Sequence, residues 1–244
     1  MAFEEIIREK PHLKDAFEIY EKIQKLKECS SSLSFSDKLT QEDVHYLMCQ
    51  LSSIFKIPYE GLVPLEEALL MESIDLSQLP VSEITNFELP YQQEELEKVL
   101  FIISKPYFLS LRKKFNLNNI FWTEGKCPIC NATPSVSLLS KGAKRRFYCT
   151  YCETIGYWKR IGCPRCLTED PRDINIITVE QKEGMRVDSC KKCLSYYKSF
   201  ENSLVNKYSL DILDIISLPL DIIAQERGFR RHSPNCVSIS KTIT

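Results

Sequence analysis

The sequence predicts an α+β fold, with a helical N-terminal domain followed by two tandem rubredoxin-like or zinc-ribbon metal modules and a C-terminal helical segment. Over the first 120 residues, apolar side chains recur at a spacing of three to four, which is typical of amphipathic helices. Beyond residue 126 the pattern changes to four Cys-x-x-Cys pairs separated by short hairpin-like segments, which is typical of small metal modules. We expect domains at 1–120, 121–160, 161–200 and 201–244.

Helical patterns occupy most of the N-terminal part. The expected helices cover about 3–27, 40–55, 66–71 and 92–115. The first is expected to be interrupted near Pro11, and the last to be broken or kinked at Pro106, because proline removes a backbone donor. Thr40 and Asp43 have the spacing of a capping box, which marks a helix start. Residues 73–90 show no sustained period and are expected to form a loop with short helical turns.

The second half predicts short strands and then helices. The expected strands are 136–139, 145–148, 156–160, 174–180 and 185–188. Lys141-Gly142 and Glu183-Gly184 are the expected hairpin turns. A helical pair is expected over 210–229, with Pro219 in the first turn of its second helix and Gly228 after its end. We expect the tail from Arg230 to be irregular.

The cysteines are the strongest signal in the chain. Eight of eleven form pairs, namely Cys127/Cys130, Cys149/Cys152, Cys163/Cys166 and Cys190/Cys193. Two thiolate pairs complete one tetrahedral S4 site, so these eight candidate metal ligands make two sites with none left over. One possible function for such pairs is that of a thiol oxidoreductase, which would need one Cys pair free of metal.

Spacing leaves the pairing and the ion open. Sequential pairing encloses loops 131–148 and 167–189, each long enough for one hairpin, whereas interleaved pairing joins the first pair with the third. Shorter loops close at lower entropic cost, although the difference is small, so we expect sequential pairing. An all-thiolate tetrahedron suits zinc or iron, and zinc is the commoner structural ion. A bridged iron–sulfur cluster is less expected.

Charge separates two classes of function. The formal net charge is −1, yet residues 126–198 contain fourteen Lys/Arg and seven Asp/Glu, a net of +7, and the remainder carries −8. Two divalent ions with eight thiolates would add about −4, so much of the basic excess balances the thiolates. A chaperone-like interaction protein is therefore favoured. A zinc-ribbon nucleic-acid-binding protein is the alternative, and it would usually need a broader basic surface.

The expected location is the cytoplasm. The N-terminus lacks a basic segment followed by an apolar stretch, so no secretory signal is expected. No run of eighteen apolar residues occurs, so no membrane span is expected. In a reducing compartment, paired cysteines are more often metal ligands than disulfides.

The remaining reactive residues favour simpler interpretations. Three cysteines (Cys29, Cys49, Cys236) and the three histidines (His12, His45, His232) lack ligand spacing to a Cys pair, so a histidine-based hydrolase has little support. The basic run 141–146 is expected to be a solvated hairpin tip. The alternative is a docking patch for an acidic surface of a partner protein. Tyr196, Tyr197 and Phe200 are expected to pack over a metal module.

The sequence around the cysteines resembles the formate dehydrogenase accessory protein family of the FdhE type. The resemblance extends over about 120–235. It is carried by Cys-Pro-Ile-Cys-Asn-Ala-Thr-Pro at 127–134, Tyr-Cys-Thr-Tyr-Cys-Glu-Thr at 148–154, Cys-Pro-Arg-Cys at 163–166, Asp-Ser-Cys-Lys-Lys-Cys-Leu-Ser-Tyr-Tyr-Lys at 188–198 and the segment 218–231. Two positions depart from the family pattern: Asn131 stands where glycine is usual, and Tyr196-Tyr197-Lys198 replaces a single aromatic before Leu-Lys.

The resemblance implies a function as well as a fold. It implies a cytoplasmic assembly factor, not an enzyme, that binds the catalytic subunit of a respiratory formate dehydrogenase during maturation. It implies iron at two mononuclear tetrathiolate sites held by the eight paired cysteines, with zinc as the alternative occupant. Nucleic acid is not an expected partner.

Overall fold

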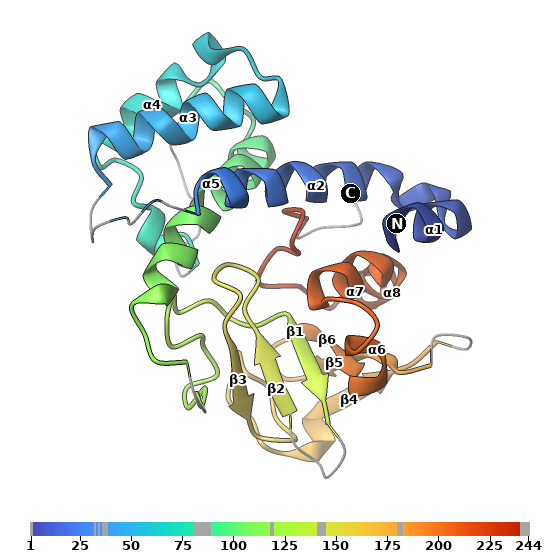
Figure 1. The fold of residues 1–244 in the computed structure, drawn as a ribbon. Helices are drawn as coiled ribbons and strands as arrows, with labels where there is room; N and C mark the ends of the chain where they lie inside the picture. Colours follow the sequence, from blue (N-terminus) through green and yellow to red (C-terminus); the bar gives the residue numbers. More distant parts are fainter. Residues whose placement is uncertain are drawn as a thin grey trace. The chain divides into compact units, whose positions relative to one another are not determined.

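The computed structural model describes residues 2–31, 33, 35, 39–80, 89–117, 120–140, 145–179 and 183–239. The chain forms two compact units, Met1–Phe115 (unit 1) and Asn116–Thr244 (unit 2), each described here by itself (Figure 1). Helices, a mixed sheet and C-terminal helices confirm the predicted α+β class. The finer division at 121–160, 161–200 and 201–244 stays a prediction.

Unit 1 is helical, as predicted. Its helices are α1 (Ala2–Glu9), α2 (Lys14–Cys29), α3 (Gln41–Phe55), α4 (Val63–Leu70) and α5 (Gln93–Lys113). Pro11 begins a 3-10 turn between α1 and α2, and Thr40 and Asp43 form the expected capping box at the start of α3. Pro106 does not break α5, because residues on both sides of it are buried in the core of the unit and packing outweighs the lost hydrogen bond. Of the loop expected at 73–90, residues 81–88 lie outside the described residues.

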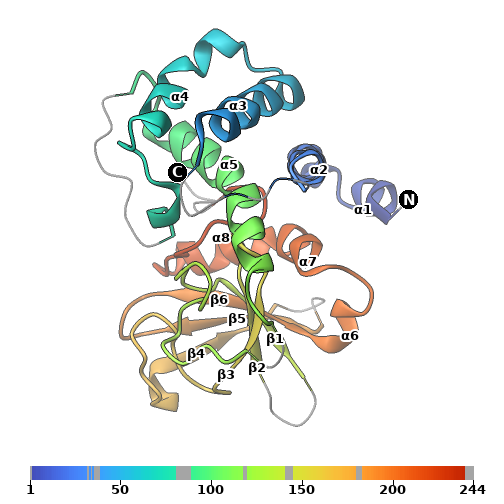
Figure 2. The same ribbon diagram turned by 60° about the vertical axis from the view of Figure 1, so that its left-hand side comes forward.

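Unit 2 is built on one six-stranded sheet. Its strands are β1 (Val136–Leu139), β2 (Arg145–Tyr148), β3 (Ile155–Trp158), β4 (Ile174–Ile177), β5 (Met185–Cys190) and β6 (Tyr196–Glu201), in the order β3-β2-β1-β6-β5-β4 (Figure 2). The expected turn at Lys141-Gly142 and residue 180 lie outside the described residues. Strand β6 was not predicted, since its residues were expected only to pack over a metal module.

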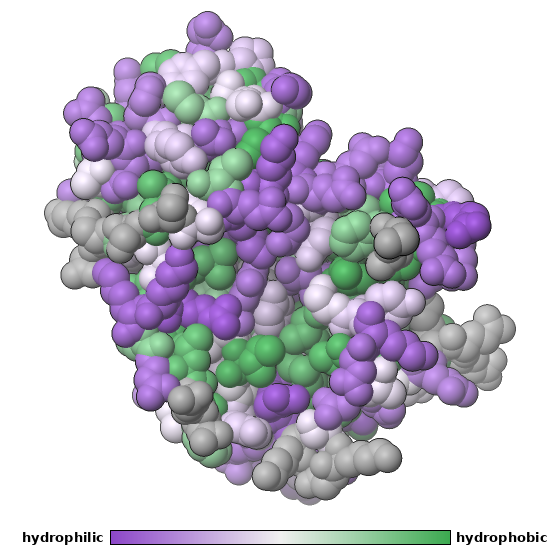
Figure 3. Space-filling view, viewed as in Figure 1, coloured by the Kyte–Doolittle hydropathy of each residue, from purple (hydrophilic) through white to green (hydrophobic). Residues whose placement is uncertain are grey.

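The two metal modules are joined through the backbone of this sheet. Strands β3-β2-β1 and β6-β5-β4 are each antiparallel. The central pair, β1 with β6, is parallel, with Val136 opposite Lys198. Each module therefore supplies half of one continuous sheet. Figure 3 shows apolar residues gathered over β1–β3 of unit 2, with further apolar residues visible elsewhere on this face.

In the described part of unit 2, short α-helices follow the sheet: α6 (Asn202–Val205), α7 (Leu210–Ile216) and α8 (Leu218–Glu226). Helix α8 covers one face of the sheet, where Leu220 and Ala224 pack in a core cluster with Val187 and Tyr196. As predicted, α8 has its proline in the first turn, and Gly228 follows with a φ of 83°. Tyr148 of β2 donates a hydrogen bond to Asp211 of α7, which attaches the first half of the sheet to the helices.

Candidate metal centres

The structure gathers the eight paired cysteines into two groups of four. The first Cys group is Cys127, Cys130, Cys149 and Cys152, and the second Cys group is Cys163, Cys166, Cys190 and Cys193. The grouping is the sequential one rather than the interleaved alternative. Within each group all Sγ atoms lie within 4.8 Å of one another.

The sulfur spacing fits one tetrahedral ion per group. In the first Cys group the Sγ atoms of Cys127 and Cys152 are 3.4 Å apart, and those of Cys130 and Cys149 are 3.3 Å apart. In the second Cys group the corresponding distances are 3.5 Å for Cys163–Cys193 and 3.7 Å for Cys166–Cys190. Four sulfurs at about 2.3 Å from a central ion would be about 3.8 Å apart. Small adjustments would therefore complete each cage.

The same backbone turn presents each Cys pair. In the first turn, the N–H of Asn131 donates to the carbonyl of Cys127 (2.8 Å), and the N–H of Cys127 donates to the carbonyl of Ala132 (2.9 Å). In all four turns the residue after the second cysteine has a positive φ between 56° and 60°, and these residues are Asn131, Glu153, Leu167 and Leu194. Asparagine tolerates this left-handed conformation, whereas the two leucines are strained in it.

This strain gives a first prediction. We expect Leu194→Gly to raise the unfolding free energy of the metal-loaded protein by about 1 kcal/mol, because glycine adopts positive φ without steric cost. Leu194 is 48% exposed, so little packing is lost. Leu194→Ala is the matched control, since it removes the side chain but keeps the backbone strain. Urea unfolding at constant metal concentration measures both, and equal stability of the two variants would contradict the prediction.

The surroundings of the thiols determine how readily they lose the protons that a bound ion replaces. Burial raises the pKa of Cys163, although a hydrogen bond with Ser195 and backbone N–H groups of its own turn lower it. Burial also raises the pKa of Cys190, against N–H groups of its turn. For Cys193, burial raises the pKa, but hydrogen bonds with Ser195, Cys163 and Cys166 together outweigh burial and bring the pKa to about 7. Ions bind thiolates, so loading these groups releases protons and weakens at low pH.

The two groups differ in exposure. All four cysteines of the first Cys group are buried, whereas Cys166 and Cys193 of the second are only partly buried. Exposed side chains border the second group, including Leu167 and Leu194. The second Cys group is therefore the more accessible to solvent.

The other cysteines and histidines stay outside both groups. Cys29 and Cys49 are half-buried in unit 1, and Cys236 is buried in unit 2. His45 contacts Glu66 and Tyr59. Within the described part of the chain, no histidine joins either Cys group.

Known proteins are similar to this chain in sequence and in fold. Residues 161–237 match the FdhE C-terminal domain. A protein FdhE homolog from Aquifex aeolicus is 26% identical over 200 residues, which is 79% of this chain and 70% of that protein. The chain is similar to FdhE proteins over most of its length, and its C-terminal part matches their C-terminal domain. The resemblance inferred from the cysteine segments is thus confirmed.

Other FdhE proteins agree over parts of the chain. An FdhE homolog from Enterobacter sp. is 31% identical over 113 residues, covering 45% of this chain but only 36% of that protein. The crystal structure of FdhE from Pseudomonas aeruginosa superposes with a TM-score of 0.57 at 20% identity, covering 89% of this chain and 79% of that one. The structural likeness shows that the fold is shared. Within the described ranges, no helix is long and apolar enough to cross a membrane.

The matched FdhE segment also contains a buried ion cluster that the sequence did not reveal. The cluster consists of Lys198, Asp214, Asp221 and Arg231, with side chains at most 2% exposed. Lys198 and Arg231 each contact Asp214, at 2.6 Å and 2.7 Å. The cluster ties β6 to α7, α8 and the segment after α8. Arg231 was expected in an irregular tail, and its burial shows that this tail is part of the core.

Proposed function

We propose that this protein, which is similar to FdhE proteins, is an accessory factor that binds the catalytic subunit of formate dehydrogenase during maturation in the cytoplasm, without catalysing a reaction itself. The observation that carries the proposal is the pair of four-cysteine groups built into one sheet of an FdhE fold. A single sheet holds the two groups in a fixed mutual arrangement, which suits a docking surface.

We also propose that the eight cysteines hold two mononuclear ions, with iron as the native ion and zinc as the alternative. The spacing of the sulfurs accommodates either. Iron would supply a one-electron redox change at each site, whereas zinc would be redox-silent. In both cases the ions would help to hold β2 and β5 in place, because Cys149 directly follows β2 and Cys190 is the last residue of β5.

Two measurements test this function. Metal analysis of protein made in its native host should give two ions per chain, and a red ferric-thiolate spectrum would identify iron. The purified, metal-loaded protein should then retain the formate dehydrogenase catalytic subunit in a pull-down, and chelator-treated protein should not. Cys29→Ser is the matched control, because Cys29 lies outside both groups. Failure of the loaded protein to retain the subunit would contradict the proposal, as would salt-dependent binding of nucleic acid in its place.

A further inference from the structure

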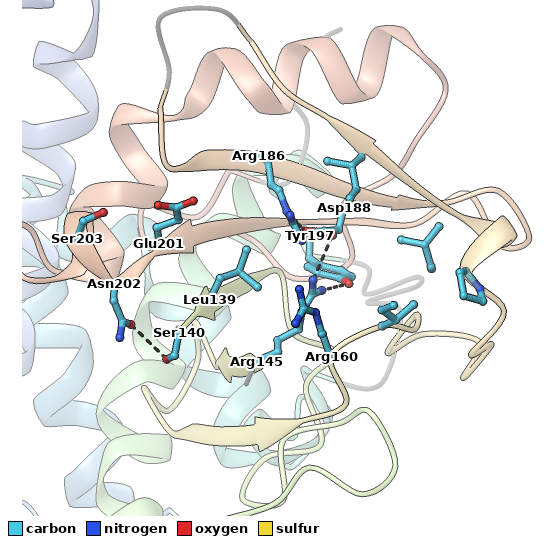
Figure 4. Close-up of a pocket in the computed structure, with 14 residues that line it drawn as sticks. Leu139, Ser140, Arg145, Arg160, Arg186, Asp188, Tyr197, Glu201, Asn202 and Ser203 are labelled. Carbon is cyan, nitrogen blue, oxygen red and sulfur yellow. Dashed lines mark hydrogen bonds and ion pairs between the residues drawn. The ribbon is translucent and has the colours of Figure 1, made fainter. Parts of the chain in front are cut away.

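A cavity of about 730 Å³ opens on unit 2, on the face of the sheet opposite α8. We call it the arginine cavity because Arg145, Arg160 and Arg186 line it. Figure 4 shows side chains from β2, β5 and β6 entering the same space, with Asp188 and Tyr197 beside Arg145. Its lining comes from both modules, and none of the eight paired cysteines contributes. It is therefore separate from the candidate metal centres.

Arg145 is the central group of the cavity. It was expected in a solvated hairpin tip, yet it is only 2% exposed. Its guanidinium contacts Asp188 at 3.1 Å and donates to the hydroxyl of Tyr197, and it lies 4.9 Å from the centre of the Tyr197 ring. Among the residues that the structure describes, its buried Nε–H has no hydrogen-bond partner. An unpaired buried donor on a charged group is costly, and a ligand acceptor would satisfy it.

Charge in the cavity favours a singly charged anion. Asp188 is buried and already pairs with Arg145 and Arg186 and accepts from Ser199. Arg160 is exposed and has no ion-pair partner in the described part of the chain. With Glu201 also at the rim, the described lining carries three positive and two negative groups. A monoanion would balance this excess, whereas a phosphate dianion would meet the carboxylate of Asp188.

Part of the cavity wall is apolar. Ile161, Pro171, Ile174 and Ile176 line it, and Ile161 and Ile176 are 44% and 52% exposed. The cavity is far larger than one small anion and has the size of a site for an organic ligand. An occupant with an apolar body could cover this wall while its charged end faces the arginines.

We propose that the arginine cavity binds a carboxylate carried on an apolar body, as in an alkyl carboxylic acid or the carboxyl end of an apolar peptide. A planar carboxylate matches the fork of a guanidinium. The unpaired Nε–H of Arg145 and the unpartnered guanidinium of Arg160 are its donors, and the isoleucines contact its body. The inference stands independently of the formate dehydrogenase role.

The test uses the metal-loaded full chain. The sequence has two tryptophans, and Trp158 lies directly opposite Arg145 in the β2–β3 pair. Titration with hexanoate, followed by the two indole N–H signals in an NMR spectrum, should give a saturable shift of the Trp158 signal. Trp158→Phe assigns that signal. Hexanamide, which has the same body without charge, should bind about tenfold more weakly or worse.

Variants locate the site. Arg160→Gln and Arg186→Gln should each weaken hexanoate binding about tenfold. Both side chains are at least partly exposed, so the fold should persist, and unchanged metal content checks this. Arg227→Gln removes the same charge from an exposed position after α8 and should change nothing. An N-acetylated alanine tetrapeptide with a free carboxyl end, compared with its amide, tells a peptide source from a free acid, and carboxylate dependence in either supports the proposal.

The proposal would be overturned by equal binding of hexanoate and hexanamide, by unchanged binding in both cavity variants, or by tighter binding of inorganic phosphate than of hexanoate. Absence of any saturable shift with hexanoate and with the free-acid peptide would do the same.

Discussion

Replacing Cys149 by serine is expected to empty the first Cys group and to unfold unit 2 as a whole, so that the second Cys group loses its ion too. A structural tetrathiolate site contributes on the order of 10 kcal/mol to folding, which is comparable to the whole stability of a small domain. Because β1 and β6 pair directly, loss of the first module would expose the central strand of the second. The effect should therefore spread beyond the substituted site.

Metal analysis and thermal unfolding measure this effect. Unit 1 has its own buried helical core, so the helical circular dichroism signal should largely persist while the unfolding transition of unit 2 disappears. Cys29→Ser, outside both groups, should keep two ions and the wild-type transition. If the Cys149 variant retained a cooperative transition for unit 2 with a single ion, the two halves of the sheet would be independent and the prediction would be wrong.

The second large effect is expected at the buried ion cluster. Asp214→Asn should lower the unfolding free energy by about 3–5 kcal/mol, because it leaves Lys198 and Arg231 with Asp221 as their only carboxylate in the cluster. Urea unfolding of the metal-loaded protein measures this loss. Glu169→Gln is the matched control, since Glu169 forms an exposed ion pair with Lys159, and exposed pairs contribute at most about 1 kcal/mol. If both variants lost a similar amount of unfolding free energy, the buried cluster would contribute no more to stability than an exposed ion pair.

The pH dependence of this variant has a definite sign. Burial raises the pKa of Asp214, but attraction by Arg231 and Lys198 outweighs burial and holds the pKa below its ordinary value. A carboxylate with a lowered folded-state pKa stabilises the fold above its unfolded pKa of about 3.9 and loses this contribution as the pH falls through the folded value. The stability difference between wild type and Asp214→Asn should therefore narrow below about pH 4. A constant difference down to pH 3 would contradict this assignment.

Local patterns predicted much of unit 2. The strands at 136–139 and 145–148 have the predicted bounds, because turn residues and cysteine pairs bracket them closely. The cysteine spacing also led to two sequential groups, since each turn is a local structure set by four or five residues. The helical pattern of unit 1 was equally local. Helix α5 shows the limit of this reasoning, because tertiary packing keeps the helix continuous through Pro106.

Features that depend on distant partners were not predictable. Strand β6 places Lys198 and Ser199 in the interior, so it lacks the apolar alternation that marks a strand. The partners of Lys198 lie on α7 and α8, and the sequence near Lys198 does not predict them. Arg145 was misplaced for the same reason, because its basic neighbours suggest a solvated turn while its partner Asp188 is 43 positions away.

The parallel pairing of β1 with β6 also sets an order for synthesis on the ribosome. Ser137 and Ser199, which share a hydroxyl hydrogen bond across this pair, are 62 positions apart. The first Cys group is complete once Cys152 has emerged, but β1 has no neighbour on its other side until β6 follows. At typical elongation rates this interval lasts several seconds. During this interval the chain has an unpaired strand edge, which can pair with other chains. If the first module binds its ion early, the exposed edge of β1 therefore carries a risk of aggregation. That risk ends when β6 is made and pairs with β1.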